Sequence, residues 1–391
     1  MVARFEPEAV VKITETELAR LAEQVHQQVG RETMTPLQRF GVSNRFAEPD
    51  RVPVILQIHE HAARLAEMPV RRICEEPVAH VYCQLRALLE YGHDLPCGFA
   101  DCYNIEVEAL GAPLVYAGDR FPEVGRRLLA EREDLDRLSL PDFAHAGRMP
   151  WVHEVNRLLG ELVGDIMGAY AAVTAPFSIA VNLRGYENLI MDIADDPDWA
   201  HRLMEFCTRL SAGFGRSQLQ HGAMATSIID AWAAPPLVSL HIFDEFVLPY
   251  TARVVGMLTP PGASWGGIWG ASAVPDWRDL VRRVIASGST NVRAFGLDLE
   301  KRPDIRLAEY KTLLTTHRRP MLCCLPARLM SRGTPADIED RVRQYVTEAA
   351  PGGGFTLYGT MVPIETPPEN VRTFVQAGKR LGRYPIEGAH V

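Results

Sequence analysis

The chain contains 391 residues, of which 47% are hydrophobic and 23% charged, and its formal net charge at pH 7 is −8. This composition predicts a globular protein with a substantial core, and the lack of a basic block argues against nucleic acid as its main partner. No apolar run reaches the roughly 18 residues that could cross a membrane, and the N-terminus shows no signal-peptide core, so a cytoplasmic protein is expected. The seven cysteines form an odd set, which predicts reduced thiols.

Apolar strand candidates alternate with helical stretches along most of the chain. The spacing in residues 8–40 predicts one or two amphipathic helices, so residues 1–50 are interpreted as an N-terminal helical extension of a domain at 51–391. Residues 114–174 are charged and predicted to be helical, as an insertion over the pocket of that domain. Eight strands are predicted at 51–58, 96–100, 175–181, 225–229, 263–268, 291–295, 321–324 and 355–358.

This alternation is typical of an α/β protein, namely a single (β/α)8 barrel of the TIM type. The side chains that follow the strands of such a barrel face one pocket, where binding and catalysis take place. These positions hold the candidate site residues His59, His61, Asp101, Cys102, Asn182, Arg184, Asp230, Trp232, Trp265, Trp269, Arg293, Asp298, Cys323, Cys324 and Thr360.

The two histidines after the first strand allow two interpretations. If the extended backbone continues, His59 and His61 point to the same side and could share a metal ion or flank a substrate. If a helix begins at His59, the two rings point in different directions and could not share a metal ion or a substrate.

The remaining candidates divide into proton carriers and substrate contacts. Asp101, Asp230 and the two histidines are the catalytic candidates, although a carboxylate such as Asp101 could equally cap the next helix. Tryptophans could form an aromatic wall or simply pack in the barrel. The predicted substrate contacts are Asn182, Arg184, Trp232, Trp265, Trp269, Arg293 and Thr360.

Several segments resemble one known superfamily, in the same order along the chain. They are RVPV at 51–54, FADCYNIEVEALGAPL at 99–114, APFSIAVNLRG at 175–185, FDEFVLPY at 243–250, GTPADIEDRV at 333–342 and GGGFTLYG…TPPENV from 352. Together they resemble the uroporphyrinogen decarboxylase superfamily, which also contains corrinoid- and coenzyme-M-linked methyltransferases. The resemblance implies a (β/α)8 barrel, and it places Asp101 where the decarboxylases bind pyrrole nitrogens.

The chain departs from both branches of that superfamily. The arginine-rich motif of the decarboxylases is replaced by QIHEHAAR from residue 57, their tyrosine by Asn182 and their C-terminal histidine by Thr360. The zinc methyltransferases use a His-x-Cys pair after strand five and a cysteine after strand eight, where this chain has Gly267, Trp269 and Thr360. A substitute zinc site would involve His59, His61, Asp101 and Cys323, while Cys323 could equally be a buried apolar residue.

Three functions remain open at this stage. Methyl transfer related to the corrinoid-linked enzymes is favoured by EVEALGAPL, Asp119 and NLRG. A decarboxylase or lyase for a smaller carboxylate and a non-catalytic small-molecule binding protein are the alternatives. The resemblance also implies a homodimer and a corrinoid protein as a possible partner; zinc at a non-standard site and no cofactor are both open.

Overall fold

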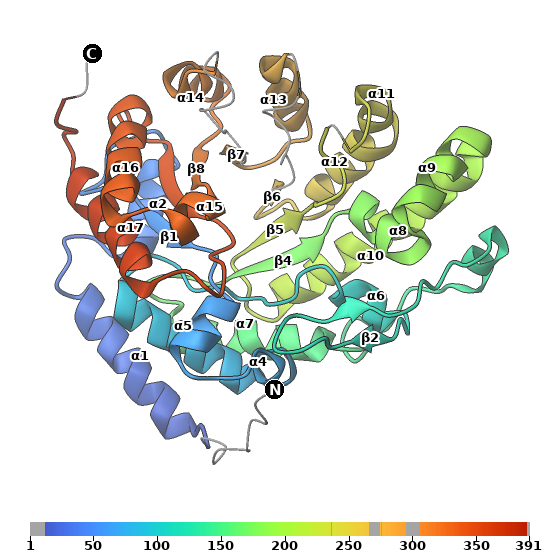
Figure 1. Cartoon of the computed structure of the whole chain (residues 1–391), viewed down its shortest axis with the longest axis horizontal. Coiled ribbons are helices and arrows are strands. Elements are labelled where there is room, and N and C mark those ends of the chain that lie inside the picture. Colours follow the sequence, from blue (N-terminus) through green and yellow to red (C-terminus); the bar gives the residue numbers. More distant parts are fainter. Residues whose placement is uncertain (1–11, 236, 266–273, 275, 295–304, 389–391) are drawn as a thin grey trace.

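The computed structural model describes residues 12–388 apart from 236, 266–273, 275 and 295–304. It is an α/β fold in which the main strands lie in the middle and helices surround them (Figure 1). The strands are β1 Val54–Leu56, β2 Leu114–Val115, β3 Glu123–Val124, β4 Tyr170–Thr174, β5 Ala225–Ile229, β6 Ala263–Trp265, β7 Val292–Ala294, β8 Met321–Leu325 and β9 Phe355–Gly359.

Helices connect these strands and cover their outer side. In the first half they are α1 Glu15–Val29, α2 Pro36–Ser43, α3 Glu60–Leu65, α4 Val70–Glu75, α5 Pro77–Tyr91, α6 Ile105–Ala109, the 3-10 helix η1 Arg132–Arg137, α7 Met149–Val163, α8 Pro176–Arg184 and α9 Tyr186–Asp195. In the second half they are α10 Pro197–Gln220, α11 Leu240–Ile242, the π-helix η2 Phe243–Val247, α12 Leu248–Met257, α13 Trp277–Ala286, α14 Leu307–Thr316, α15 Ala327–Arg332, α16 Pro335–Ala349 and α17 Pro368–Leu381.

The main strands form two parallel sheets. One has the order β1-β9-β8-β7 and the other β4-β5-β6. Between β1 of the first sheet and β4 of the second, the segment at 94–97 contacts both strands. The amide of Asp94 donates to the carbonyl of Val54 in β1 at 2.7 Å, and Cys97 makes a parallel bridge to Tyr170 of β4. Between β6 of the second sheet and β7 of the first, the amide of Thr290, just before β7, donates to the carbonyl of Ala263 in β6 at 2.9 Å. Short links therefore join the two sheets on both sides.

The predicted third strand is wrong. Residues 176–181 belong to α8, Ala175 precedes that helix, and the strand is the preceding segment β4 Tyr170–Thr174. Pro176 stands at the first turn of the helix, where its fixed φ and missing amide are tolerated. Because α8 is buried on nearly all sides, its continuous apolar run resembled that of a buried strand.

The other strand predictions are close to the structure. β5 coincides with the predicted 225–229, and β8 and β9 each extend one residue beyond their predictions. β1 is shorter than predicted, and the strand expected at 96–100 is present only as the bridge at Cys97. The ends of the predicted strands at 263–268 and 291–295 lie outside the described residues.

Residues 114–174 are less helical than predicted. They begin with an antiparallel hairpin in which Leu114 of β2 pairs with Val124 of β3, and they continue through η1 into a single α-helix, α7, before β4. The part before α7 extends from the main body beside α6 in Figure 1. We call residues 114–148 the excursion.

A neutral cluster of buried and half-buried charges connects the start of the described chain to its end. Arg39 pairs with Glu32, Asp50 and Asp94 at 2.7 to 2.9 Å. Arg51 pairs with Glu32 and Asp94, and Lys379 of α17 reaches the other oxygen of Glu32 at 2.6 Å. Three cations thus face three carboxylates, so this burial leaves no net charge unpaired.

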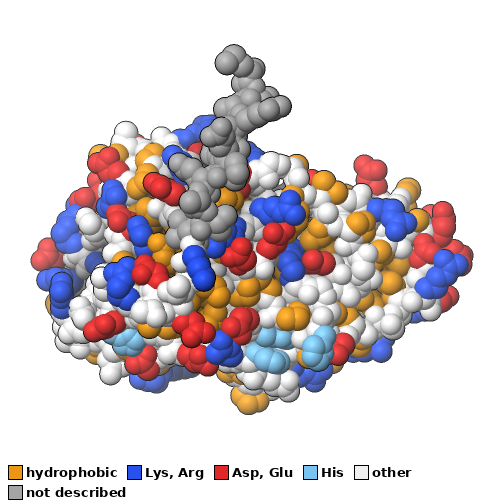
Figure 2. Space-filling model, turned by 90° about the horizontal axis from the view of Figure 1, so that it is seen from below, with side chains coloured by type: hydrophobic (Ala, Val, Ile, Leu, Met, Phe, Trp, Pro, Cys, Tyr) orange, Lys and Arg blue, Asp and Glu red, His pale blue; other side chains and the backbone are white. Residues whose placement is uncertain are grey.

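Acidic and basic side chains are interspersed on the molecular face seen in Figure 2. None of the described helices is both long and apolar enough to cross a membrane.

Candidate functional site

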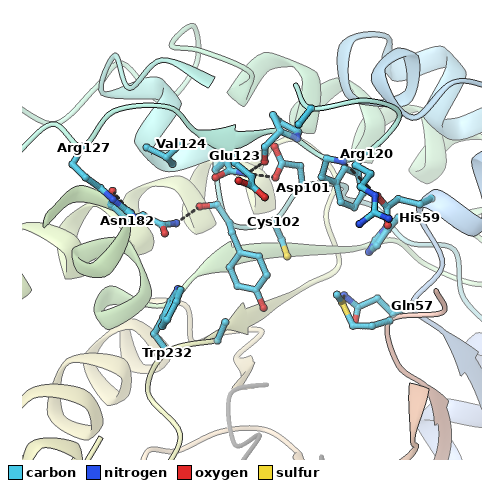
Figure 3. Close-up of a pocket in the computed structure, with 18 of the residues that line it drawn as sticks. Gln57, His59, Asp101, Cys102, Arg120, Glu123, Val124, Arg127, Asn182 and Trp232 are labelled. Atoms are coloured by element: carbon cyan, nitrogen blue, oxygen red, sulfur yellow. Dashed lines mark hydrogen bonds between the residues drawn. The ribbon is translucent and has the colours of Figure 1, made fainter. Parts of the chain in front are cut away.

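A cavity of about 920 Å³ opens at the carboxyl ends of the strands. The residues that follow β1, β5 and β9 contribute to it, together with α8, the loop at 101–104 and the excursion. Its lining consists of Gln57, His59, Glu60, Asp101, Cys102, Tyr103, Asn104, Ala117, Arg120, Phe121, Pro122, Glu123, Val124, Arg127, Asn182, Ala231, Trp232, Leu237 and Met361. Figure 3 shows Asp101 and Cys102 in the middle, Gln57 and His59 at one end, and Asn182 and Trp232 at the other.

Asp101 lies on the cavity wall with both carboxylate oxygens bonded. One oxygen accepts from the Asn104 amide and the other from the Arg148 guanidinium, each at 2.5 Å. Arg148 also pairs with Glu108 at 2.5 Å. Burial raises the pKa of Asp101 to about 6, although Arg148 and Asn104 oppose the rise. Its backbone has φ +48°, a left-handed conformation that is uncommon outside glycine and often found at functional sites.

Glu106 is a second buried carboxyl near Asp101, and it was not among the predicted site residues. It accepts from the backbone amide of Thr174 at 2.6 Å and lies 2.8 Å from the Thr174 hydroxyl, which also donates to the carbonyl of Cys102. Burial raises the pKa of Glu106 to about 7. Since the hydroxyl has one proton, a protonated Glu106 can donate to Thr174 while Thr174 donates to Cys102. We call Asp101, Asn104, Glu108, Arg148 and the adjacent Glu106–Thr174 pair the carboxylate side.

His59 lies at the other end of the cavity and has a different environment. It is the residue before α3 and is 7% exposed, and neither ring nitrogen has a hydrogen-bond partner among the residues that the structure describes. Its ring centroid lies 5.0 Å from that of Phe99 and 6.0 Å from that of Phe121. Burial, and secondarily His80, lower the pKa of His59 to about 3, so the ring is neutral near pH 7.

The structure separates the two histidines. α3 begins at Glu60, so the helical alternative holds and the side chains diverge. His61 is 1% exposed, and its Nε2 lies 2.8 Å from the Tyr91 hydroxyl rather than in the cavity lining. Burial lowers the pKa of His61 to about 4.

Thr360 follows β9, the strand that pairs with β1. The amide of Gln57 donates to the carbonyl of Gly359 at 2.8 Å, so Gln57 and Thr360 lie on neighbouring strand ends. Thr360 is 6% exposed and does not belong to the cavity lining, and its hydroxyl has no hydrogen-bond partner among the described residues. The Gln57 side chain accepts from the Tyr358 hydroxyl at 2.7 Å and donates weakly to the Met361 sulfur. We call Gln57, His59 and Thr360 the imidazole side.

Asp230 follows β5 as predicted but does not belong to the cavity lining. It is fully buried and accepts from the Ser178 hydroxyl of α8 at 2.6 Å. Burial raises its pKa to about 6, partly offset by Ser178 and the Trp265 indole. The next two residues, Ala231 and Trp232, reach the cavity instead.

Arg184 was predicted to hold a substrate carboxylate, but its guanidinium is already occupied. It pairs with Asp192 at 2.7 Å and donates to the carbonyls of Leu129 and Ala130. The prediction failed because it placed Arg184 after a strand, whereas the residue ends α8. Asn182, two residues earlier, does line the cavity and donates to the carbonyl of Tyr103 at 2.7 Å.

The predicted aromatic wall is only partly present. Trp232 lines the cavity and stacks on Tyr186 with ring centroids 5.6 Å apart. Trp265 is 1% exposed and stacks on Phe243 at 5.6 Å, so it packs in the core. Trp269 and Asp298 lie outside the described residues. Arg293 belongs to β7, but its side chain also lies outside the described part.

Two arginines from the excursion were missed. Arg127 lines the cavity and donates to the carbonyls of Val181 and Asn182. Arg120 also lines it, is exposed, and makes no ion pair with another described residue. Both lie in an irregular segment, where no strand end or motif could have marked them.

The described side chains do not fit a zinc ion. Cys323 is buried in β8, where burial raises the pKa of its thiol well above the usual range, and it does not line the cavity with His59. Within the described ranges, no three His, Cys, Asp or Glu side chains gather in an arrangement that could hold a metal ion. The predicted site of His59, His61 and Cys323 is therefore not assembled, because the histidines diverge and the cysteine lies elsewhere.

Comparison with known proteins shows full-length relatives of two kinds. The methylated-thiol–coenzyme M methyltransferase of Methanosarcina mazei is 26% identical over 88% of this chain and 89% of its own. The uroporphyrinogen decarboxylase of Pelobacter propionicus is also 26% identical, over 85% of this chain and 96% of its own. A solved methyltransferase structure from Methanosarcina mazei has a TM-score of 0.74 at 18% identity, covering 88% of this chain and 98% of that one, which shows a shared fold.

A family model described as uroporphyrinogen decarboxylase (URO-D) matches residues 35–381, which is most of the chain. Its match begins just before α2 and ends with α17, so it includes every strand and both sides of the cavity. The chain therefore belongs to the uroporphyrinogen decarboxylase family.

Proposed function

We propose that this protein transfers a methyl group to or from a small molecule bound in the cavity. The observation that carries the proposal is Asp101, a buried carboxyl on the cavity wall whose pKa of about 6 lets it exchange a proton near neutral pH. A methyl group leaves a heteroatom more readily when that atom is protonated, and Asp101 is placed to donate this proton or to receive it in the reverse direction.

The cavity suits a small molecule better than a tetrapyrrole with many carboxylates. Such a substrate would need several fixed cations, because an unpaired buried carboxylate is costly. Among the described lining residues, Arg127 is engaged by backbone carbonyls, and the nearby Arg148 by two carboxylates. Arg120 alone is left among the described cations of the lining. The full-length methyltransferase relatives support the same choice.

A corrinoid held by a partner protein is the proposed second reactant. Two relatives from Methanosarcina are named methylcobamide:CoM methyltransferases. Leu237 and Met361 belong to the lining and remain 43% and 41% exposed, so the open side of the cavity offers apolar surface to a flat macrocycle. A corrinoid would supply or accept the methyl group, while the residues of this chain bind the small molecule and move the proton.

The wider architecture belongs to the same proposal. We infer that the two sheets close into one (β/α)8 barrel, supported by the links at Cys97–Tyr170 and Thr290–Ala263. The division into an extension at 1–50 and a barrel at 51–391 also remains a proposal, as do a homodimer and a cytoplasmic location.

The direct test is methyl turnover with methylcobalamin and a panel of acceptors, in the wild type and two matched variants. Asp101→Asn keeps the shape but cannot donate a proton, so turnover should fall about 100-fold or more. The rate should also lose its titration near pH 6, the pKa of Asp101. Asp230→Asn is the control, because Asp230 has a similarly raised pKa but does not line the cavity. Equal losses in both variants would contradict a role in the reaction for Asp101.

Decarboxylation of a small carboxylate is the second candidate. Arg120 lines the cavity without an ion pair to a described residue, and it could hold a carboxylate near Asp101. Carbon dioxide release without methyl turnover would favour this function. Ligand binding without either reaction would favour a non-catalytic binding protein.

A further inference from the structure

Three polar residues, Gln57, His59 and Thr360, follow the ends of two neighbouring strands, β1 and β9. Side chains alternate along a strand, and Ile55 of β1 and Tyr358 of β9 both line a small inner cavity between the sheets. Gln57 and Thr360 are two residues farther along and directly follow the two strands, so the alternation predicts the same inner side for both; Gln57 lines the large cavity, and Thr360 is buried outside its lining. His59 follows at the point where β1 passes into α3 and lines the large cavity with Gln57.

These side chains hold unused hydrogen-bonding capacity. Both nitrogens of His59 and the hydroxyl of Thr360 are buried without a partner, whereas nearly all buried polar groups in proteins have one. His61, one residue beyond Glu60, bonds to Tyr91 through Nε2, so one nitrogen of its ring is paired, whereas neither nitrogen of His59 is paired among the described residues. A ligand oxygen that meets His59 or Thr360 would remove this deficit.

The surroundings favour an uncharged ligand group on an apolar body. Gln57, neutral His59 and Thr360 carry no charge, and the rings of Phe99 and Phe121 flank His59. Arg120, the cation of the lining without a described ion pair, is exposed rather than buried with them. An anion at this position would lose its hydration, and no buried cationic side chain among the described lining residues would compensate for that loss.

We propose that the imidazole side binds an uncharged oxygen, a hydroxyl or methyl-ether oxygen, carried by a small aromatic or apolar molecule. This inference rests on the proposed methyl transfer and specifies its substrate class. The poor fit of the described side chains to zinc supports this substrate class. Zinc makes a thiol substrate reactive by holding it as a thiolate, so a thiol is less expected where no zinc site is assembled. The residues here offer neither that ligand set nor a buried cation, but they do offer donors and acceptors for a neutral oxygen.

The test is equilibrium binding, measured by calorimetry with three probes of similar size. 2-Methoxyphenol supplies two neutral oxygens, thioanisole has a sulfur in place of the ether oxygen and no hydroxyl, and 2-methoxybenzoate has a charged carboxylate in place of the hydroxyl. We expect 2-methoxyphenol to bind at least about 10-fold more tightly than thioanisole, because a site built to hydrogen-bond an oxygen rejects an analogue that lacks it. Equal or tighter binding of thioanisole or 2-methoxybenzoate would overturn the proposal.

Variants of His59 and Thr360 tie any preference to these side chains. His59→Phe and Thr360→Val keep the approximate volume and remove the polar atoms, so the preference for 2-methoxyphenol should fall toward onefold. His59→Gln restores a donor and an acceptor and should recover part of it. Thermal unfolding of each variant checks folding, and we expect no decrease for His59→Phe, since it removes unpartnered polar atoms. An unchanged preference in the folded His59→Phe protein would refute the assignment.

Binding and turnover fail independently. If the oxygen preference depends on His59 but no methyl group is transferred from any donor, the binding inference stands and the proposed function falls. If thiols are methylated at a rate that His59→Phe does not change, the proposed function stands and the oxygen site falls.

Discussion

The two sides of the cavity differ in how completely their polar atoms are used. On the carboxylate side, both oxygens of Asp101 accept charged or amide donors, and Arg148 joins Asp101 to Glu108. On the imidazole side, His59 and Thr360 are equally buried but unpartnered. The first side is therefore preorganised by the protein itself, whereas the second is completed only by what binds there.

This contrast separates positioning from recognition. A carboxyl held by two fixed donors keeps one orientation, which suits proton transfer to a bound molecule. Buried polar atoms without partners in the protein discriminate between ligands. A ligand that forms hydrogen bonds with them binds more tightly than one that leaves them buried without a hydrogen bond.

The largest expected effect comes from breaking the carboxylate side. Arg148→Met leaves Asp101 and Glu108 without their shared cation and should lower the free energy of unfolding by about 3 kcal/mol. Chemical denaturation measures it. The loss should be smaller at pH 5 than at pH 8, because burial raises the pKa of Asp101 to about 6 and the carboxyl is then largely protonated.

Arg157 provides the matched control for Arg148. It also pairs with two carboxylates, Glu154 and Glu161, but its side chain is 47% exposed. Arg157→Met should cost less than about 1 kcal/mol. If the two variants lost the same stability, burial of the carboxylate side would not be the reason for its strength.

An intermediate effect should appear in the pH dependence of stability. The pKa of His59 is lowered to about 3 in the folded state, so the unfolded chain binds its proton first as the pH falls below about 6.5. Stability is then lost between about pH 6.5 and 3. His59→Phe removes this contribution and should reduce the loss between pH 6 and 4 by about 2 kcal/mol.

The control for this titration is His145→Phe, whose wild-type side chain is 81% exposed. Among the described residues it pairs only with the exposed Asp142, so its removal should change the acid sensitivity much less than His59→Phe does. A His59→Phe protein with the same acid sensitivity as wild type would mean that His59 is protonated or reaches solvent in the folded protein. The imidazole side would then not be a dry, neutral site.

The smallest effect compares two buried threonines at strand ends. Thr174→Val removes a hydroxyl that contacts Glu106 and Cys102, and should cost about 2 kcal/mol. Thr360→Val removes a hydroxyl without a partner, so stability should stay within about 0.5 kcal/mol or rise slightly. Thermal unfolding of both variants measures the difference, and a large loss in Thr360→Val would show that its hydroxyl is already satisfied.

Much of the fold could be predicted because it depends on local patterns. Strands β5, β8 and β9 are short apolar runs bounded by turns or helices, and their positions follow from the sequence almost to the residue. The segment at 175–181 failed because a helix buried on nearly all sides has no polar face to reveal its period. The strand at 96–100 is reduced to a bridge at Cys97, and such a loss depends on packing rather than composition.

The site was predictable mainly at positions close behind a predicted strand end, and Asn182 lines the cavity although its predicted strand is a helix. His59, Asp101 and Trp232 were found this way, and all three line the cavity. Arg184 was misassigned because its strand was misplaced. Arg120 and Arg127 of the cavity lining were missed, as was Glu106, which is buried near Asp101, since the excursion and α6 place them through tertiary contacts that no sequence spacing encodes.

The neutral cluster around Arg39 and Arg51 has a consequence for the newly made protein. Glu32 is completed by Lys379, a residue that is translated 347 positions later. Until that last helix leaves the ribosome, the early segment holds a carboxylate oxygen that lacks its final cation. A chain stalled before α17 should therefore hold the segment around Glu32 less firmly than the finished protein does, although Arg39 and Arg51 already pair with it.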